Sequence, residues 1–421
     1  MDKKRSAILL GVNLQFAKEE FEYTMQELKA LAEACHIEVV GEVIQNLNRV
    51  NKSTYIGTGK LEELTFLLNE TEAELLICND ELSPSQIKIL EEKLETTVKD
   101  RTMLILDIFA ERAKTREAQM QVEVAQLQYM LPRLMDQRAS LGRQGGGAGL
   151  KNRGAGETKL ELDRRKVEKR IAFLKKELEN LTAQRKTQRN ARMKSDIPIV
   201  SLVGYTNAGK STIMNAILEK FQASPEKTVF EKDMLFATLE TSVRKIELTN
   251  KKSFLLTDTV GFVNKLPHHL IKAFRSTLEE VVHADLIIHV VDCSEKNDQL
   301  FMEVTDATLK SIGIQNKPII YAYNKADLID FEIPYVKDDC VFLSAKERVG
   351  LDELIQVISK HIFKDYVKCE MIIPYQEGQL LSYFMNHASV EAVEYLENGT
   401  KLKMECKFRD FKKYQKYVFP S

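Results

Sequence analysis

Nine consecutive residues have the types and spacing of a phosphate-binding loop. They match Gly-x4-Gly-Lys-Ser/Thr and stand between a predicted buried strand at 199–203 and an amphipathic helical pattern at 213–218, the context that this motif requires. The glycines let backbone N–H groups converge on a β-phosphate, the lysine reaches the β and γ oxygens, and the serine can hold Mg²⁺. The predicted nucleotide contacts are Gly204, Tyr205, Thr206, Asn207, Ala208, Gly209, Lys210, Ser211 and Thr212.

A second segment carries residues suited to a metal ion and a γ-phosphate. The predicted strand at 254–257 leads directly into Asp258-Thr259-Val260-Gly261. The Asp258 carboxylate can join the shell of the Mg²⁺, and the Gly261 N–H can sense the γ-phosphate.

Two further strand ends predict which base is bound. The strand at 318–323 ends at Asn324-Lys325-Ala326-Asp327, and the strand at 341–343 is followed by Ser344-Ala345-Lys346. The Asp327 carboxylate can accept from guanine N1–H and N2–H₂, a pair of donors that adenine lacks, and the backbone at 344–346 can approach guanine O6. Four such segments in order, each at a strand end, predict a guanine nucleotide. The base contacts are Asn324, Lys325, Asp327, Ser344, Ala345 and Lys346.

Arranged in this order, the segments resemble those of the translation-factor-related GTPases. The resemblance narrows to HflX, a family of ribosome-associated GTPases, and it covers about residues 5–365. The segments that carry it are GYTNAGKST at 204–212, FATL at 236–239, DTVGF at 258–262 and, upstream, the loop GGGAGLKNRGAGETKLE at 145–161.

This resemblance implies hydrolysis of GTP to GDP and phosphate with Mg²⁺, binding to the large ribosomal subunit and its RNA, and splitting of stalled or hibernating ribosomes. It maps Thr238 onto the switch threonine that covers Mg²⁺ and the γ-phosphate. The implied catalytic residues are Lys210, Thr238 and Gly261, and the implied metal ligands are Ser211, Thr238 and Asp258. Ala155 departs from the family loop, which usually has proline between two glycines.

Phe262 stands where many GTPases place a glutamine that orients water. A phenyl ring cannot polarise water, so we expect slow intrinsic hydrolysis and another group that positions the nucleophile.

The segment 131–195 is strongly basic. It holds 18 Lys or Arg residues against 7 Asp or Glu, whereas the whole chain has 61 against 62 and a net charge of −1. A basic insert in an acidic body is typical of a surface that binds a polyanion. Within it, seven of the chain's 18 glycines lie between 142 and 156, interleaved with cations. We favour contact with RNA phosphates over a passive flexible linker. The predicted RNA contacts are Arg143, Lys151, Arg153, Lys159, Arg164 and Arg165.

The elements that must position these residues form four predicted domains of an α/β protein. Residues 1–102 alternate short strands at 6–14, 37–43, 74–78 and 97–98 with amphipathic helices at 19–34, 60–68 and 84–94. This alternation indicates a mostly parallel sheet. Residues 103–195 form a long antiparallel helical hairpin around a glycine-rich loop at 141–157. A P-loop GTPase domain with a last helix at 351–362 covers 196–365. An α+β domain with an Asn398-Gly399 hairpin turn and a final helix at 408–418 covers 366–421. Two apolar stripes of equal spacing predict the hairpin seam: Met120, Val124, Leu127, Leu131 and Leu134, and Val167, Ile171, Leu174, Leu178 and Leu181.

Composition narrows the class of protein. A hydrophobic fraction of 44% is typical of a globular chain rather than a disordered one, and no apolar run is long enough for a membrane span. The first apolar stretch predicts a buried strand rather than a signal peptide. The six cysteines are widely spaced with no CxxC pair, which points to a reducing compartment and no zinc site. We therefore expect a cytoplasmic monomer.

Two alternatives to a ribosome-splitting GTPase stay open at this point. One is a GTP-regulated switch in which the first and last domains bind a protein. The other is an RNA remodeller with an additional ATP site in the N-terminal domain, although the turn Gly57-Thr58-Gly59-Lys60 is shorter than a phosphate loop.

Overall fold

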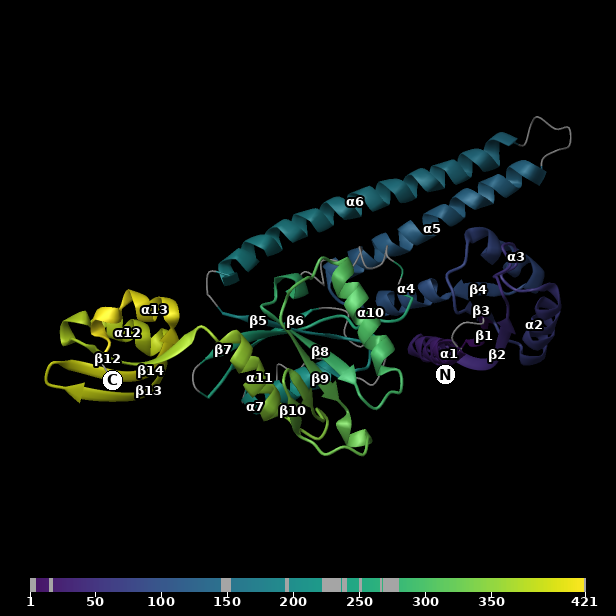
Figure 1. Cartoon of the computed structure of the whole chain (residues 1–421). Coiled ribbons are helices and arrows are strands. Elements are labelled where there is room, and N and C mark those ends of the chain that lie inside the picture. The colour runs from purple at the N-terminus through teal and green to yellow at the C-terminus, as the bar shows by residue number, and fades with distance from the viewer. Residues whose placement is uncertain are drawn as a thin grey trace. The chain divides into compact units, whose positions relative to one another are not determined.

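The computed structural model describes residues 5–14, 18–144, 153–193, 197–221, 236, 241–249, 252–265, 267 and 280–419 (Figure 1). For residues 18–19, 134–144, 153–160 and 184–193 it describes the backbone alone. The chain divides into two compact units. The first contains residues 1–191, 232–240 and 261–277, and the second contains residues 192–231, 241–260 and 278–421.

The first unit opens with a four-stranded parallel sheet in the order β2-β1-β3-β4. Its elements are β1 (Ser6–Asn13), α1 (Lys18–Ala34), β2 (Glu38–Asn46), α2 (Thr58–Thr71), β3 (Leu75–Cys78), α3 (Pro84–Leu94), β4 (Thr97–Asp100) and α4 (Arg101–Arg112). Each predicted strand and helix of this region is present, with ends within three residues of the prediction. The start of α3 shows why, because Ser83 accepts a hydrogen bond from the Gln86 N–H at 3.2 Å and Pro84 takes the first helical position.

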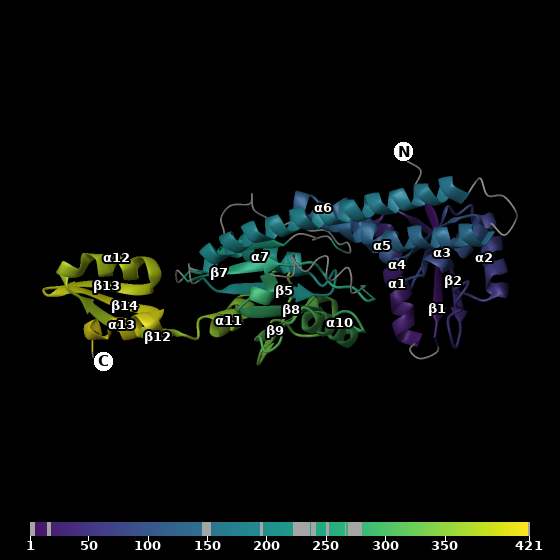
Figure 2. The ribbon, with the colours of Figure 1, turned by 90° about the horizontal axis from the view of Figure 1, so that it is seen from above.

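Two long helices complete the first unit. They are α5 (Arg116–Gln144) and α6 (Arg153–Met193), and they lie side by side in Figures 1 and 2. Residues of both predicted stripes form one apolar cluster, which confirms the seam: Met120, Val124, Leu127, Leu174, Leu178 and Leu181. Both helices extend into the predicted loop at 141–157, since α5 continues to Gln144 and α6 already begins at Arg153. A cavity of about 420 Å³ opens beside Pro132, the proline inside α5.

The second unit is built on a seven-stranded sheet in the order β10-β11-β9-β8-β5-β7-β6. The five central strands are parallel, and β10 and β6 are antiparallel edges. Its elements are β5 (Ile199–Gly204), α7 (Lys210–Phe221), β6 (Ser242–Glu247), β7 (Ser253–Asp258), β8 (Leu286–Asp292), α10 (Asp298–Ser311), β9 (Ile319–Asn324), β10 (Tyr335–Lys337), β11 (Cys340–Phe342) and α11 (Leu351–Ile362).

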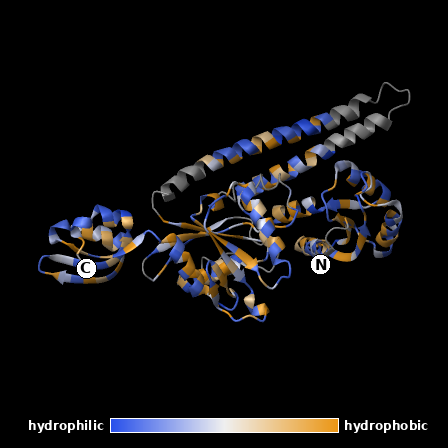
Figure 3. Ribbon diagram, viewed as in Figure 1, coloured by the Kyte–Doolittle hydropathy of each residue, from blue (hydrophilic) through white to orange (hydrophobic). Residues whose placement is uncertain are grey.

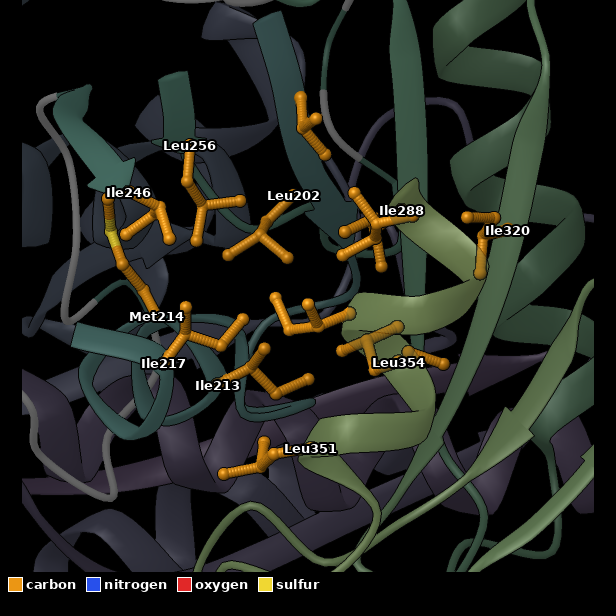
Figure 4. Packing of buried hydrophobic residues seen from close by; sticks show 14 of the residues in the cluster. Leu202, Ile213, Met214, Ile217, Ile246, Leu256, Ile288, Ile320, Leu351 and Leu354 are labelled. Atoms are coloured by element: carbon orange, nitrogen blue, oxygen red, sulfur yellow. The ribbon is translucent and has the colours of Figure 1, made fainter. Parts of the chain in front are cut away.

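The core of this sheet is aliphatic. Side chains of β5, β7, β8 and β9 meet those of α7 and α11 on one face, as Figure 4 shows for Leu202, Ile213, Leu256, Ile288 and Leu354. Because both faces of a parallel sheet are covered by helices, its central strands are continuous apolar runs. Figure 3 shows these strands as mainly hydrophobic and the described part of α6 as mainly hydrophilic.

A small three-stranded antiparallel sheet, in the order β12-β14-β13, follows α11. Its elements are β12 (Tyr366–Ile373), α12 (Gly378–His387), β13 (Ser389–Leu396), β14 (Gly399–Lys407) and α13 (Phe408–Lys413). The prediction of one final helix at 408–418 is wrong beyond Lys413. The chain instead forms a short 3₁₀ turn at 415–417 and then pairs with β12, where the Phe419 N–H donates to the Glu370 carbonyl at 2.8 Å.

Across the part of the chain that the structure describes, no helix is both long and apolar enough to cross a membrane.

Candidate functional site

The predicted phosphate loop lies between the carboxyl end of β5 and the start of α7. Gly204 has φ of +148°, and a Cβ there would stand 2.3 Å from the Val290 carbonyl oxygen. Gly209 has φ of +92°, and a Cβ there would stand 2.1 Å from the Asn324 side-chain nitrogen. Both positions therefore require glycine, because a side chain would meet strain and a neighbouring strand.

Lys210 is almost fully buried at the first turn of α7. Its Nζ donates to the carbonyl oxygens of Gly204 at 3.1 Å and Tyr205 at 2.7 Å, so the ammonium is folded back onto the loop. Burial lowers the pKa of Lys210 to about 8, against the opposing effect of the Asp258 carboxylate. A phosphate bound at this loop would place a negative charge beside the buried ammonium of Lys210.

Ser211 and Asp258 come together from α7 and the end of β7. The Ser211 hydroxyl donates to the Asp258 carboxylate at 2.6 Å, and Asp258 is fully buried. The parallel register of β5 and β7, which pairs Leu202 with Asp258, brings this carboxylate to the phosphate loop. A hydroxyl and a carboxylate oxygen are hard ligands of the kind that Mg²⁺ prefers, so the residues present fit that ion.

Asn324 at the end of β9 joins two of the predicted segments. Its side-chain N–H donates to the Ala208 carbonyl at 2.9 Å, and its carbonyl oxygen accepts from the Ala345 N–H at 2.9 Å. Ser344 is buried and exchanges two backbone hydrogen bonds with Val349. The side chain of Asn324 thus holds the phosphate loop against the segment 344–346.

Lys325 and Asp327 follow at the same edge of the sheet. Lys325 has φ of +62°, and its Nζ lies 2.6 Å from the Asp292 carboxylate at the end of β8. Asp327 stands in a short 3₁₀ turn with its side chain exposed to solvent, where it can meet a ligand. Four neighbouring parallel strands, β9, β8, β5 and β7, therefore end at Asn324, Asp292, Gly204 and Asp258. Ligands of open α/β sheets bind at such a row of carboxyl ends.

Two partners of this site were absent from the sequence predictions. Asp292 was missed, although β8 shows the signal that identified Asp258 after β7 and Asn324 after β9, a largely apolar run that ends in a polar residue. Tyr205 in the loop stacks on Phe301 of α10, with ring centroids 4.4 Å apart and planes at 23°. No sequence signal pointed to that pair, since it depends on how α10 packs.

The structure describes only some of the predicted switch residues. Gly261 and Phe262 are described, and Phe262 is 2% exposed, so its ring is a packed side chain. Thr238 lies outside the described residues.

Of the predicted RNA contacts, the described side chains are Arg164 and Arg165. Arg164 Nε lies 3.0 Å from Glu168, and Arg165 Nε lies 3.1 Å from Glu161. These basic residues of α6 therefore pair with acidic residues one turn away on the same helix. Lys151 and the side chains of Arg143, Arg153 and Lys159 lie outside the described part.

Comparisons with known proteins match almost the whole chain. Residues 22–110 match the family model of the GTP-binding GTPase N-terminal domain, residues 112–192 match the GTP-binding GTPase middle region, and residues 199–325 match the 50S ribosome-binding GTPase. The GTPase HflX of Caldanaerobacter subterraneus is 42% identical over 411 residues, which are 97% of this chain and 93% of that protein. The GTPase HflX of Escherichia coli is 36% identical over 95% of this chain and 92% of its own length.

Among solved structures, a GTP-binding protein from the hyperthermophilic archaeon Sulfolobus solfataricus in complex with GDP is 25% identical, with a TM-score of 0.44. The match covers 86% of this chain and 99% of that one. From the sequence matches, which span nearly all of its residues, it follows that the chain belongs to the HflX family and is a GTP-binding GTPase.

Proposed function

We propose that the GTP-bound protein docks on the large ribosomal subunit through its basic hairpin and glycine-rich loop, splits stalled or hibernating ribosomes, and is reset by hydrolysis. The observation that carries this proposal is the charge of residues 131–195, 18 Lys or Arg against 7 Asp or Glu, placed directly before a guanine nucleotide site. The relatives' family model, named as ribosome-binding for residues 199–325, supports the same partner.

The ion pairs of α6 are compatible with RNA binding. Exposed pairs such as Arg165 with Glu161 contribute little stability. An arginine can therefore leave its glutamate for a phosphate at little cost. The binding strength would then come from release of counterions, which depends on salt.

In the proposed reaction, the loop 204–209 and Lys210 bind the β- and γ-phosphates, and Asp327 selects guanine. Ser211, Asp258 and Thr238 would hold Mg²⁺, which neutralises phosphate charge when it is bound. The Gly261 N–H would hold the γ-phosphate. Phe262 supplies no hydrogen bond to water, so intrinsic turnover should be slow until the ribosome or another group of the chain positions the nucleophile.

We also propose that the protein is a cytoplasmic monomer. All six cysteines are free thiols, as expected in a reducing compartment. Sedimentation equilibrium would test the monomeric state.

The hairpin prediction tests the ribosome contact. Replacing Arg143, Lys151 and Arg153 by alanine should weaken co-sedimentation with the large subunit in the presence of a non-hydrolysable GTP analogue. The dependence of log K on log salt should flatten by about one unit of slope for each lost phosphate contact. GTP affinity should hardly change, because these residues are outside the nucleotide site.

A matched control removes the same charge elsewhere. Lys29, Lys52 and Lys93 are exposed on the N-terminal domain, and their triple alanine variant should co-sediment like the parent. If the hairpin variant also behaves like the parent at every salt concentration, the proposed RNA contact is wrong, while the GTPase assignment stands.

The buried lysine predicts a pH dependence of nucleotide affinity. The pKa of Lys210 is lowered to about 8 without nucleotide, and bound phosphates favour the charged form. Below about pH 8 the ammonium is already charged. Above it, binding must take up a proton, so the Kd for GTP should rise by up to about tenfold per pH unit.

Titrations with a fluorescent GTP analogue between about pH 7 and pH 9 measure this effect. Lys210→Arg serves as the control, because its guanidinium stays charged across the range and its Kd should not rise. A Kd for the parent that is independent of pH would contradict the lowered pKa of Lys210.

A further inference from the structure

The last part of the chain carries a basic and aromatic segment that the proposed function does not use. Residues 407–419, which we name the basic-aromatic segment, read KFRDFKKYQKYVF and contain five cations with a single acidic residue, Asp410. Their aromatic residues are Phe408, Phe411, Tyr414, Tyr417 and Phe419. Aromatic rings interleaved with cations are typical of surfaces that bind single-stranded nucleic acid.

The fold turns the acidic residue inward and the lysines outward. Asp410 is 7% exposed and its carboxylate accepts from the Tyr383 hydroxyl at 3.2 Å, although Arg409 also lies 3.9 Å from it. Lys412, Lys413 and Lys416 are exposed, because the opposite side of the segment, with Phe411, Tyr414 and Tyr417, packs on the core of the C-terminal sheet. The lysines therefore outnumber the acidic groups on this surface, where Glu377 accepts from the Tyr417 hydroxyl at 2.9 Å.

Each of these lysines lies over a ring of the same segment. The distances from Nζ to the ring centroid are 5.1 Å for Lys412 over Phe408, 4.9 Å for Lys413 over Tyr414 and 4.5 Å for Lys416 over Tyr417. A ring face attracts the ammonium without neutralising its charge. The lysines are therefore held in place with their charge available to an anion.

Exposed rings stand beside this charge. Phe408 is 47% exposed and Phe419 is 45% exposed. Lys412 lies over the Phe408 ring, and the Phe411 ring lies nearly parallel to it with centroids 6.4 Å apart. A base would therefore stack on the part of the Phe408 ring that stays exposed beside the ammonium, while its phosphates meet the lysines.

The same segment borders a cavity of about 880 Å³ in the second unit. Its lining includes the cationic residues Lys364, Lys407, Arg409 and Lys412, together with Phe408. Two acidic residues, Asp285 and Asp365, also line it, and the Asp285 carboxylate is engaged by the Ile199 N–H at 2.8 Å. The cavity is large enough for a nucleotide-sized group.

We propose that the basic-aromatic segment binds single-stranded RNA, with Lys412 and Lys413 on phosphates and Phe408 stacked on a base. The inference rests on the proposed function in that the natural RNA would belong to the ribosome. An acidic protein segment would also meet the lysines, but it would leave the exposed ring of Phe408 without a role.

The test measures binding of a fluorescent oligouridine of about 12 nucleotides to the full-length chain by anisotropy. Every variant also carries the alanine substitutions of Arg143, Lys151 and Arg153, so that the hairpin contributes equally. Lys412→Ala/Lys413→Ala should bind about tenfold or more weakly near 0.1 M salt, and the salt slope should fall by about 1.4 units for two lost contacts.

The matched control is Lys368→Ala/Lys403→Ala, which removes the same charge from exposed positions on the same domain. This control should bind the oligouridine with the same affinity as the protein that carries only the three hairpin substitutions. Phe408→Ala should weaken binding by about fivefold or more with an unchanged salt slope, because it removes stacking and no charge.

Three results would overturn the proposal. Equal binding by the two double variants would show that Lys412 and Lys413 do not contact RNA. No measurable RNA binding by the protein that carries only the three hairpin substitutions would show that the basic-aromatic segment does not bind RNA. Displacement of the RNA by polyglutamate, with no effect of Phe408→Ala, would point to an acidic protein partner instead. These results are separable from failure of the proposed function, which is read from the parent's co-sedimentation with large subunits.

Discussion

Asp327→Asn should weaken GTP binding and relax the rejection of other purine nucleotides. The substitution removes the acceptor that faces two guanine donors, and a site built to bond such donors discriminates by up to about 10⁴-fold. Asp327 lies exposed beyond β9, in the turn that follows Asn324 and Lys325, so the change should leave the fold intact. Xanthosine triphosphate presents a carbonyl where guanine has its amino group, and the new amide can donate to it. Competition between GTP and xanthosine triphosphate should therefore shift toward the latter.

The control for this substitution is Asp330→Asn, which makes the same chemical change at an exposed position three residues further along. It should keep the parent's preference for GTP. If Asp327→Asn also keeps that preference, Asp327 does not bind the guanine base.

Lys210→Ala should lower GTP binding and turnover by about 10²- to 10³-fold or more. The reason is that the ammonium is the one charged donor at the phosphate loop among the described residues, and loss of a single donor at a site of developing charge has an effect of this size. Single-turnover hydrolysis, with and without large ribosomal subunits, gives the rates.

Thermal unfolding separates this effect from misfolding. Without nucleotide, Lys210→Ala should unfold no earlier than the parent, because a buried ammonium with a lowered pKa is already costly to the folded state. The increase in unfolding temperature that GTP gives the parent should be lost. Lys220→Ala, at the other end of α7 and paired with Asp352 at the surface, should retain both the increase and the turnover. A Lys210→Ala variant with normal turnover would place the phosphates elsewhere.

Local patterns in the sequence predicted most of the framework. The apolar runs of β5, β7 and β9 and the helical periodicity of α11 identify elements whose bounds agree with the structure to within a residue or two. These predictions succeed because the period of burial and the turn residues are local properties. The same patterns placed Gly204, Asp258 and Asn324 at strand ends, so the sequence also indicated that they would share one edge of a parallel sheet.

Some predictions failed where distant contacts outweigh local preference. The final helix stops at Lys413 because the chain beyond it pairs with β12, where Val418 lies opposite Met371, 47 residues earlier in the sequence. The ion pairs within α6 were also not predicted, although Glu161 and Glu168 lie one helical turn from Arg165 and Arg164.

The sequence by itself determined the α/β fold class, the hairpin seam and the residue types of the nucleotide site, because each depends on the spacing of residues that are close together in the chain. Only the tertiary structure decided how those residues act together. The burial that lowers the pKa of Lys210, the Asn324 bonds that join the loop to Ala345, and the Asp292 partner of Lys325 all depend on which strands are neighbours. The order of strands in a sheet is set by packing of the whole unit, and no local pattern specifies it.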